Sequence, residues 1–160
     1  MPPLGSSKDQ ARVPDKVPVI LLVEDNPADV RLAQEVLREM GLAHVLHVAR
    51  DGEQAMRMLR READSAHLQL PDLVLLDLNL PRKDGREVLK EMKSDPQLKR
   101  IPVLILSTSR ADSDVLACYE HHANAYLTKP VDLDEFGKLA SQLRDFWLTL
   151  VVLPPKLVEP

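Results

Sequence analysis

The sequence predicts an α/β fold, a doubly wound parallel sheet of five strands with helices on both faces. Two observations lead to this prediction. Five short apolar runs alternate with five segments of helical periodicity along most of the chain, and parallel strands need crossovers of this kind. The runs are also apolar at nearly every position, which is typical of strands that are covered on both faces.

The overall composition is that of one globular domain. The chain has 160 residues, of which 44% are hydrophobic and 29% are charged, enough to bury a sizeable core. A net charge of −4 without a dense basic patch argues against nucleic acid as a partner. The sequence has neither the ~20 apolar residues of a membrane span nor the apolar core of a signal peptide. Because Cys118 is its only cysteine, we expect a reducing compartment and a cytoplasmic protein.

In the first half of the chain, turn and cap residues separate three expected strands from two expected helices. Asn26 offers an N-cap with a proline at the first helical position, and Gly41 suits the end of that helix. Asp51 and Gln54 resemble a capping box, so a second helix is expected to begin there. The expected strands are the apolar runs at residues 19–23, 44–49 and 73–76.

The second half continues the alternation with three helices and two strands. Asp84 and Gly85 open the third helix, and the fifth, which begins at Asp132, is expected to be the longest. The apolar positions that mark the fourth helix are Val115, Leu116 and Tyr119. The expected strands are the apolar runs at residues 102–106 and 125–128.

Polar side chains follow four of the five expected strands, at the edge where open α/β sheets bind ligands. Three carboxylates close together repel one another, and a divalent cation that prefers oxygen ligands, Mg²⁺ or Mn²⁺, would relieve this repulsion. A carboxylate beside such a cation can attack phosphorus, while a hydroxyl and an ammonium bind the phosphoryl oxygens. The pattern therefore predicts a phosphoryl-transfer site. Its residues are Glu24, Asp25, Asp77, Ser107 and Lys129.

At this point the sequence resembles the receiver domain of two-component response regulators. The resemblance rests on four motifs in order, which are LLVEDN, LLDLNLPRKDG, ILSTS and AYLTKP. It implies a flavodoxin-like sheet with strand order 2-1-3-4-5. It also implies that Asp77 accepts a phosphoryl group from a sensor histidine kinase. Mg²⁺ would be held by Glu24, Asp25, Asp77 and the main-chain carbonyl of Asn79.

The resemblance further implies how such a site would switch. Ser107 would hydrogen-bond the phosphoryl group and draw its loop inward, and Lys129 would bridge to the phosphoryl oxygens. Tyr126 would be a rotameric switch that turns inward on activation, although tyrosine also suits a half-buried strand position. The peptide bond between Lys129 and Pro130 is expected to be cis, which would need tertiary support.

The two ends of the chain differ from the central domain. Residues 1–17 are rich in proline, serine and charge, so we expect a disordered tail. Residues 18–145 form the expected receiver domain, and residues 146–160 form an apolar extension. Since a helix that is apolar nearly all round favours burial, we expect a two-fold symmetric homodimer through the fifth helix, this extension and neighbouring surfaces. Folding back onto its own subunit is the alternative. The expected interface residues are Phe146, Trp147, Leu150 and Val151.

Several functional alternatives remain open from the sequence. The stand-alone layout, the "VEDNPADVRL" start and the "FWLTLV" tail resemble the small regulators paired with bacterial phytochrome kinases. An aspartyl-phosphate phosphatase is a competing hypothesis, but such enzymes use Asp-x-Asp and this chain has Asn79 at the second position. An unphosphorylated binding module of the same fold is a third. The output would be an effector protein or a further phosphotransfer step.

Overall fold

Five parallel strands form one sheet in the computed structural model, which describes residues 17–130 and 132–156. The strand order is β2-β1-β3-β4-β5, which confirms the predicted fold. The expected N-terminal tail lies almost entirely outside the described residues. The strands are β1 (Val19–Val23), β2 (Val45–Ala49), β3 (Leu73–Leu76), β4 (Val103–Ser107) and β5 (Ala125–Thr128).

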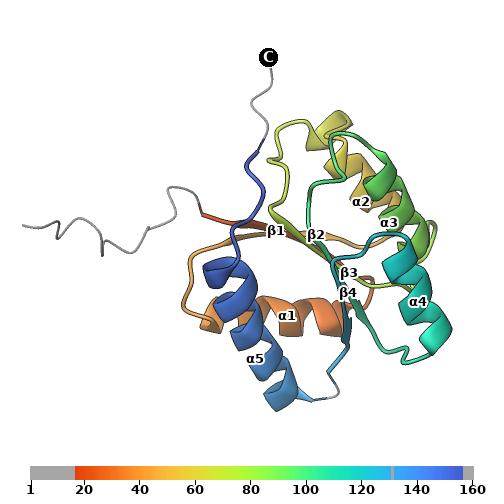
Figure 1. The fold of residues 1–160 in the computed structure, drawn as a ribbon. Coiled ribbons are helices and arrows are strands. Elements are labelled where there is room, and N and C mark those ends of the chain that lie inside the picture. The colour runs from red at the N-terminus through yellow and green to blue at the C-terminus, as the bar shows by residue number, and fades with distance from the viewer. Residues whose placement is uncertain (1–16, 131, 157–160) are drawn as a thin grey trace, which may run out of the picture.

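The helices cover both faces of this sheet. Figure 1 shows α1 and α5 on one face and α2, α3 and α4 on the other. No helix in the described part of the chain is long and apolar enough to cross a membrane. The helices are α1 (Pro27–Glu39), α2 (Gly52–Leu59), α3 (Gly85–Ser94), α4 (Asp112–Glu120) and α5 (Leu133–Gln142), with a 3-10 turn at Ala63–Ser65 and a π-helix at Leu143–Leu150.

Two hydrophobic cores lie on the two faces of the sheet. Every residue of β1, β3 and β4 is buried, because each of these strands contributes side chains to both cores. The core beneath α1 and α5 includes Phe136 and Leu143, and the opposite core includes Leu59, Leu89 and Met92. Burial on both faces leaves the carboxyl ends of the strands as the place where polar groups can reach solvent.

Side-chain caps start α1 and α2 as the sequence predicts. Asn26 accepts hydrogen bonds from the backbone N–H groups of Ala28 and Asp29 at 2.9 and 3.2 Å. The Asp51 side chain accepts from the N–H of Gln54 at 2.7 Å. Gly41 follows α1 with a φ of 77°, a left-handed conformation that ends a helix at little cost. These caps satisfy donors that the first turn would otherwise leave unpaired.

Helix α4 exposes two of the three apolar positions that mark it in the sequence. Leu116 and Tyr119 are 59% and 48% exposed, whereas Cys118 is buried against the core. The Tyr119 hydroxyl accepts a hydrogen bond from the N–H of Tyr126 at 3.1 Å, so the Tyr119 side chain reaches the edge strand β5. The two apolar side chains therefore lie on the outer surface, and Cys118 makes the core contact.

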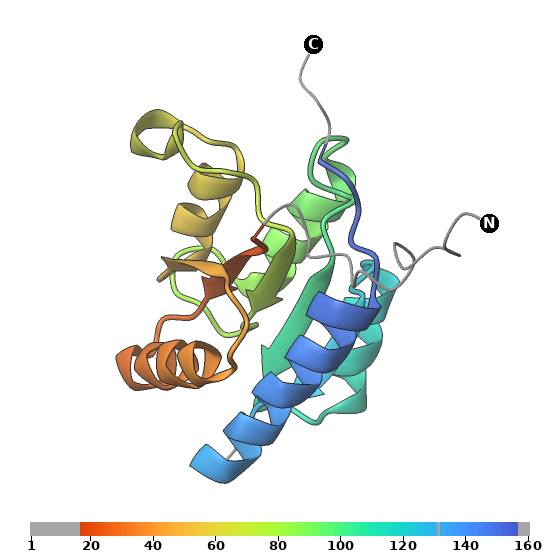
Figure 2. The ribbon, with the colours of Figure 1, turned by 90° about the vertical axis from the view of Figure 1, so that its left-hand side faces the viewer.

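The last helix changes its hydrogen-bonding pattern halfway along. Helix α5 has 10 residues, fewer than the 13 of α1, so it is not the longest α-helix as the sequence suggested. It continues as an eight-residue π-helix, in which the N–H of Val151 donates to the carbonyl of Phe146 at 2.8 Å, five residues back. Figure 2 shows the two segments as one continuous helical run.

The π-helix divides the apolar extension between the domain and the solvent. Trp147 and Leu148 pack against the core under α1 and α5, whereas Phe146 and Leu150 are 50% and 70% exposed. A π-helix turns less per residue than an α-helix, so an apolar stripe with α-helical spacing does not stay on one face. Trp147 therefore packs back onto its own subunit. Phe146 and Leu150 remain exposed and are available for an interface.

Candidate functional site

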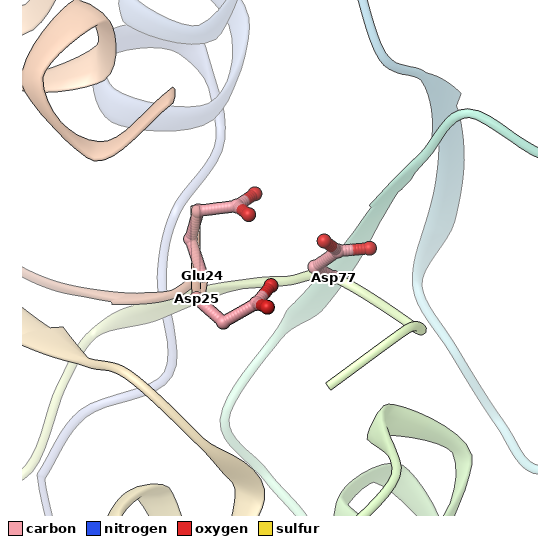
Figure 3. A group of neighbouring side chains, drawn as sticks. All are labelled: Glu24, Asp25 and Asp77. Carbon is pink, nitrogen blue, oxygen red and sulfur yellow. The ribbon is translucent and has the colours of Figure 1, made fainter. Parts of the chain in front are cut away.

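Three carboxylates meet at the carboxyl ends of β1 and β3. Glu24 and Asp25 directly follow β1, Asp77 directly follows β3, and these two strands are hydrogen-bonded neighbours. The N–H of Asp77 donates to the carbonyl of Val23 at 3.1 Å, so the ladder continues to Asp77. One ligand oxygen from each acid lies within 4.8 Å of the others, and Figure 3 shows the three carboxyl groups gathered around one space.

Burial of two of these acids makes the cluster electrostatically unfavourable on its own. Glu24 is 2% exposed and Asp77 is 7% exposed, while Asp25 lies open to solvent. Burial raises the pKa of Glu24 above its ordinary value, although a hydrogen bond from Lys129 opposes the shift. A buried, oxygen-only donor set beside an open carboxylate suits a hard divalent cation such as Mg²⁺ or Mn²⁺.

Lys129 provides the positive charge of the site. Its Nζ lies 2.6 Å from Glu24 Oε2, 2.8 Å from Asp29 Oδ2 and 3.4 Å from Asp77 Oδ2. Burial alone would lower the pKa of Lys129, but hydrogen bonds to Asp29 and Glu24 outweigh it and hold the pKa above its usual range. The ammonium group is therefore charged and partly neutralises the acids.

Asp29 is the site residue that sequence reasoning missed. It lies in the first turn of α1, where an acid is also favoured by the positive end of the helix dipole. A usable signal was present, because Asp29 comes four residues after Asp25 and the turn of α1 begins at the same sheet edge.

The end of β5 differs from the expectation in one respect. The N–H of Lys129 donates to the carbonyl of Ser107 at 2.7 Å, which extends the pairing of β4 and β5 to the lysine. No cis peptide bond occurs among the described residues, so the bond between Lys129 and Pro130 is trans and the cis expectation is wrong. The trans form is intrinsically favoured by ~0.5–1 kcal/mol, and in this form the lysine reaches Glu24, Asp29 and Asp77.

The loop from β3 to α3 is held by backbone contacts. The N–H of Gly85 donates to the carbonyl of Leu78 at 2.9 Å, and the N–H of Asn79 approaches Asp77 Oδ1 at 3.3 Å. A Cβ on Gly85 would lie 2.1 Å from the carbonyl oxygen of Asp77. A Cβ on Gly52, at the start of α2, would lie 2.0 Å from the carbonyl oxygen of Lys83. Both positions require glycine, because backbone atoms occupy the space.

The loop from β4 to α4 carries the expected hydroxyl and ends near the expected switch tyrosine. Ser107 is fully buried at the end of β4, and its Oγ accepts a hydrogen bond from the N–H of Ser109 at 3.2 Å. The Tyr126 hydroxyl donates to the carbonyl of Ser109 at 2.8 Å. The structure thus places Ser107 and Tyr126 on either side of Ser109, whereas Glu24, Asp25, Asp77 and Lys129 form the charged group.

This arrangement combines a nucleophile, a cation site and two groups that can bind an anion. The carboxylate of Asp77 lies beside those of Glu24 and Asp25, and 3.4 Å from the ammonium of Lys129. Such a carboxylate can attack phosphorus while the surrounding positive charges stabilise the equatorial phosphoryl oxygens. The geometry therefore suits phosphoryl transfer to Asp77.

Comparison with known proteins defines the class. Residues 20–141 match the family described as the response regulator receiver domain. The chain belongs to this family, so it is a phosphoacceptor signalling protein of two-component systems. A receiver domain implies a cognate histidine kinase as the source of its phosphoryl group.

Particular relatives are similar over nearly the whole chain. The response regulator Rcp1 of Synechocystis sp. is 52% identical over 136 residues, which cover 85% of this chain and 92% of that protein. The crystal structure of the phosphorylated cyanobacterial phytochrome response regulator RcpA is 48% identical, with a TM-score of 0.84 over 88% of this chain and 100% of that one.

A solved structure of Rcp1 bears on the metal. The crystal structure of the Mn²⁺-bound form of Rcp1 is 51% identical, with a TM-score of 0.82 over 86% of this chain and 99% of that one. Together with the acidic cluster of Glu24, Asp25 and Asp77, this similarity identifies the site as one for a divalent cation, Mg²⁺ or Mn²⁺.

Proposed function

We propose that this chain receives its phosphoryl group on Asp77 from a phytochrome-type histidine kinase in the cytoplasm. The observation that carries the choice of Asp77 is its position, buried at the end of β3 within reach of Glu24, Asp25 and Lys129. The kinase class is supported by the similarity to Rcp1 and RcpA, since RcpA is described as a phytochrome response regulator.

In this proposal the acids would hold the metal, and Asp77 is also the nucleophile. Glu24, Asp25, Asp77 and the main-chain carbonyl of Asn79 would hold Mg²⁺, whose chemistry is to neutralise charge on the phosphoryl oxygens. A carboxylate oxygen of Asp77 forms the new P–O bond as the P–N bond of the kinase phosphohistidine breaks. The imidazole keeps the electron pair of the broken bond and later takes up a proton from water.

The remaining groups recognise the product. Lys129 Nζ already lies 3.4 Å from Asp77 Oδ2, so it can move onto a phosphoryl oxygen with little displacement. Ser107 would donate its hydroxyl proton to a second phosphoryl oxygen, since its Oγ at present accepts from Ser109. Tyr126 would change its hydrogen bond when the loop containing Ser109 moves.

The test is phosphorylation of the purified chain. Incubation with acetyl phosphate and Mg²⁺ should add a single phosphoryl group by intact mass, and chelation of the metal or Asp77→Asn should abolish the addition. Asp112→Asn, an exposed aspartate at the start of α4, is the matched control and should remain fully phosphorylated. Phosphorylation of Asp77→Asn at wild-type yield would contradict the assignment.

A second experiment addresses the kinase. A phytochrome histidine kinase labelled with radioactive phosphate should transfer the label to the chain faster than an unrelated histidine kinase does. Equal rates from both kinases would contradict the proposed pairing and leave the phosphoacceptor function intact. The phosphorylated protein would then contact an effector or donate to a further phosphotransfer protein.

The exposed apolar side chains among residues 146–156 support a homodimer. Phe146, Leu150 and Val152 are 50%, 70% and 90% exposed at the end of the last helix, and neighbouring apolar exposure of this kind favours an interface. Residues 18–145 would be the switch, and the extension would join two copies by two-fold symmetry. Trp147 contributes indirectly, since its ring meets that of Phe146 edge-on with centroids 5.6 Å apart.

Sedimentation velocity tests the homodimer. Phe146→Ser combined with Leu150→Ser should shift the chain to monomer while leaving phosphorylation unchanged. Leu116→Ser, at a similarly exposed position on α4, is the control and should leave the dimer intact. A wild-type chain that sediments as a monomer at all concentrations would contradict this part of the proposal.

A further inference from the structure

Three side chains beside the site form a polar connection between α3 and the β4–α4 loop. Ser109 Oγ donates to Asp114 Oδ2 at 2.6 Å, and Arg86 Nη2 donates to Asp114 Oδ1 at 2.8 Å. Arg86 also contacts both oxygens of Asp84, the N-cap of α3, at 3.2 and 3.3 Å. The connection of Ser109, Asp114 and Arg86 is named the latch below.

Every polar group of Ser109 makes a hydrogen bond. Its N–H donates to Ser107 Oγ, its carbonyl accepts from the Tyr126 hydroxyl, and its hydroxyl binds Asp114. Ser109 therefore links the hydroxyl that would bind the phosphoryl group to the tyrosine that would respond to it. Movement of this loop toward Asp77 changes the lengths of these hydrogen bonds.

The anchor of the latch lies on the fixed side of the site. Arg86 is in the first turn of α3, directly after the loop that Gly85 holds against the carbonyl oxygen of Asp77. Hydrogen bonds from Ser109 and Arg86 hold the pKa of Asp114 below its ordinary value, so its carboxylate is charged at neutral pH. The latch thus joins the β4–α4 loop to the first turn of α3 through a charged pair.

We propose that the latch restrains the β4–α4 loop in the unphosphorylated protein and so lowers the affinity of the site for a phosphoryl group. Arg86 and Asp114 are positioning residues in this inference, which rests on Asp77 being the phosphoacceptor. Arg86 and Asp114 have side chains that are 35% and 28% exposed, so their ion pair is partly screened by water. A restraint of this strength adjusts the equilibrium between two loop positions without preventing the change.

The experiment measures binding of beryllium fluoride, which mimics a phosphoryl group on a carboxylate, to the full chain in Mg²⁺ by isothermal titration calorimetry. Arg86→Ala and Asp114→Ala should each bind about two- to fivefold more tightly than wild type, the range expected for losing a partly exposed ion pair. Arg110→Ala is the matched control, because Arg110 is an exposed arginine of the same loop. It should bind as wild type does.

Two further variants separate positioning from general stability. Arg86→Lys keeps the positive charge but not the forked contact with two aspartates, so its affinity should lie between those of wild type and Arg86→Ala. The double variant Arg86→Ala with Asp114→Ala should match Asp114→Ala alone, because both changes remove one connection. A merely structural role would lower the unfolding midpoint of the variants and leave beryllium fluoride binding unchanged or weaker.

The outcomes separate failure of the latch from failure of Asp77 as the phosphoacceptor. Equal or weaker binding by Arg86→Ala, with wild-type binding intact, overturns the latch and leaves Asp77 as the phosphoacceptor. If the wild-type chain itself fails to bind beryllium fluoride in Mg²⁺, the phosphoacceptor assignment is contradicted and the latch is overturned with it.

Discussion

The two loops that flank Asp77 are held by different kinds of contact. In the β3–α3 loop, backbone atoms lie where a side chain at Gly85 or Gly52 would have to be. In the β4–α4 loop, the contacts of Ser109 are hydrogen bonds to Ser107, Asp114 and Tyr126. Close backbone packing leaves no alternative arrangement, whereas hydrogen bonds can be exchanged for others at small net cost. The nucleophile is therefore fixed, and its partner hydroxyl is on the adjustable side.

The largest effect should come from filling the space at Gly85. Gly85→Ala places a methyl group 2.1 Å from the carbonyl oxygen of Asp77 and 2.7 Å from Cα of Leu78, and neither backbone atom can yield. We expect a loss of at least ~3 kcal/mol in the free energy of unfolding, the upper range for overpacking, and loss of phosphorylation by acetyl phosphate. Urea denaturation measures the first and intact mass the second.

Gly137→Ala is the matched control for that prediction. Gly137 lies inside α5 with nothing within 4 Å of an added Cβ. Alanine is the better helix former by ~0.5–1 kcal/mol, so this variant should be slightly more stable than wild type. A Gly85→Ala protein as stable as Gly137→Ala would show that the β3–α3 loop can move, contrary to the comparison.

The next largest effect should follow removal of the central cation. Lys129→Met leaves Glu24, Asp29 and Asp77 without the ammonium that contacts all three. In a chelator we expect ~2–3 kcal/mol lower stability, less than for a fully enclosed pair because the site opens to water. Saturating Mg²⁺ should reduce this difference, since a divalent cation neutralises the same acids. Urea denaturation of Lys129→Met and of the exposed Lys138→Met control, with and without Mg²⁺, measures both effects.

The pH dependence of metal binding tests the fixed side of the site. Burial raises the pKa of Glu24, so the metal-free protein takes up a proton at Glu24 at a higher pH than an ordinary glutamate does. Protons and Mn²⁺ compete for this carboxylate. The apparent Mn²⁺ affinity should therefore fall as the pH is lowered, by up to ~10-fold per pH unit below that pKa. Glu24→Gln should bind more weakly but with a flatter pH profile by calorimetry. Parallel profiles would mean that Glu24 is not a ligand.

The smallest effect is expected on the adjustable side. Tyr126→Phe removes the hydrogen bond to the carbonyl of Ser109 and little else, and a hydrogen bond of this kind contributes ~0.5–1.5 kcal/mol. Thermal unfolding should show a loss in this range, with acetyl phosphate still phosphorylating the variant. A loss above ~3 kcal/mol in the free energy of unfolding would contradict the comparison, because it would mean that the β4–α4 loop is held as tightly as the β3–α3 loop.

The sequence predicts the fixed parts of the site better than the adjustable parts. Asp77 and Lys129 could be placed because each follows an apolar strand, and the sheet brings strand ends together. The latch could not be placed in this way. Arg86 and Asp114 are 28 residues apart on helices whose relative rotation depends on side-chain packing. The apolar positions of α4 do not reveal this rotation, because Leu116 and Tyr119 are exposed.

The cis expectation at Pro130 was wrong and the π-helix was not predicted, and both have local causes. The peptide bond before Pro130 was expected to be cis from family resemblance, but the residues themselves carry no preference strong enough to decide it. The interface residues were aligned by α-helical spacing, and the change to π-helix after Leu143 separates Phe146 from Trp147. No residue type in that segment is specific to a π-helix.

In the π-helix at Leu143–Leu150, the direction in which each side chain points depends on the number of residues that precede it in the helix. Its i to i+5 hydrogen bonds accommodate one more residue in a turn than an α-helix does. Inserting or deleting one residue before Phe146 would rotate Phe146 and Leu150 about the helix axis by roughly the angle of one residue. Phe146 and Leu150 would then point in new directions with the composition almost unchanged. An insertion or deletion, more than a substitution, is therefore the change by which such regulators could acquire a different partner.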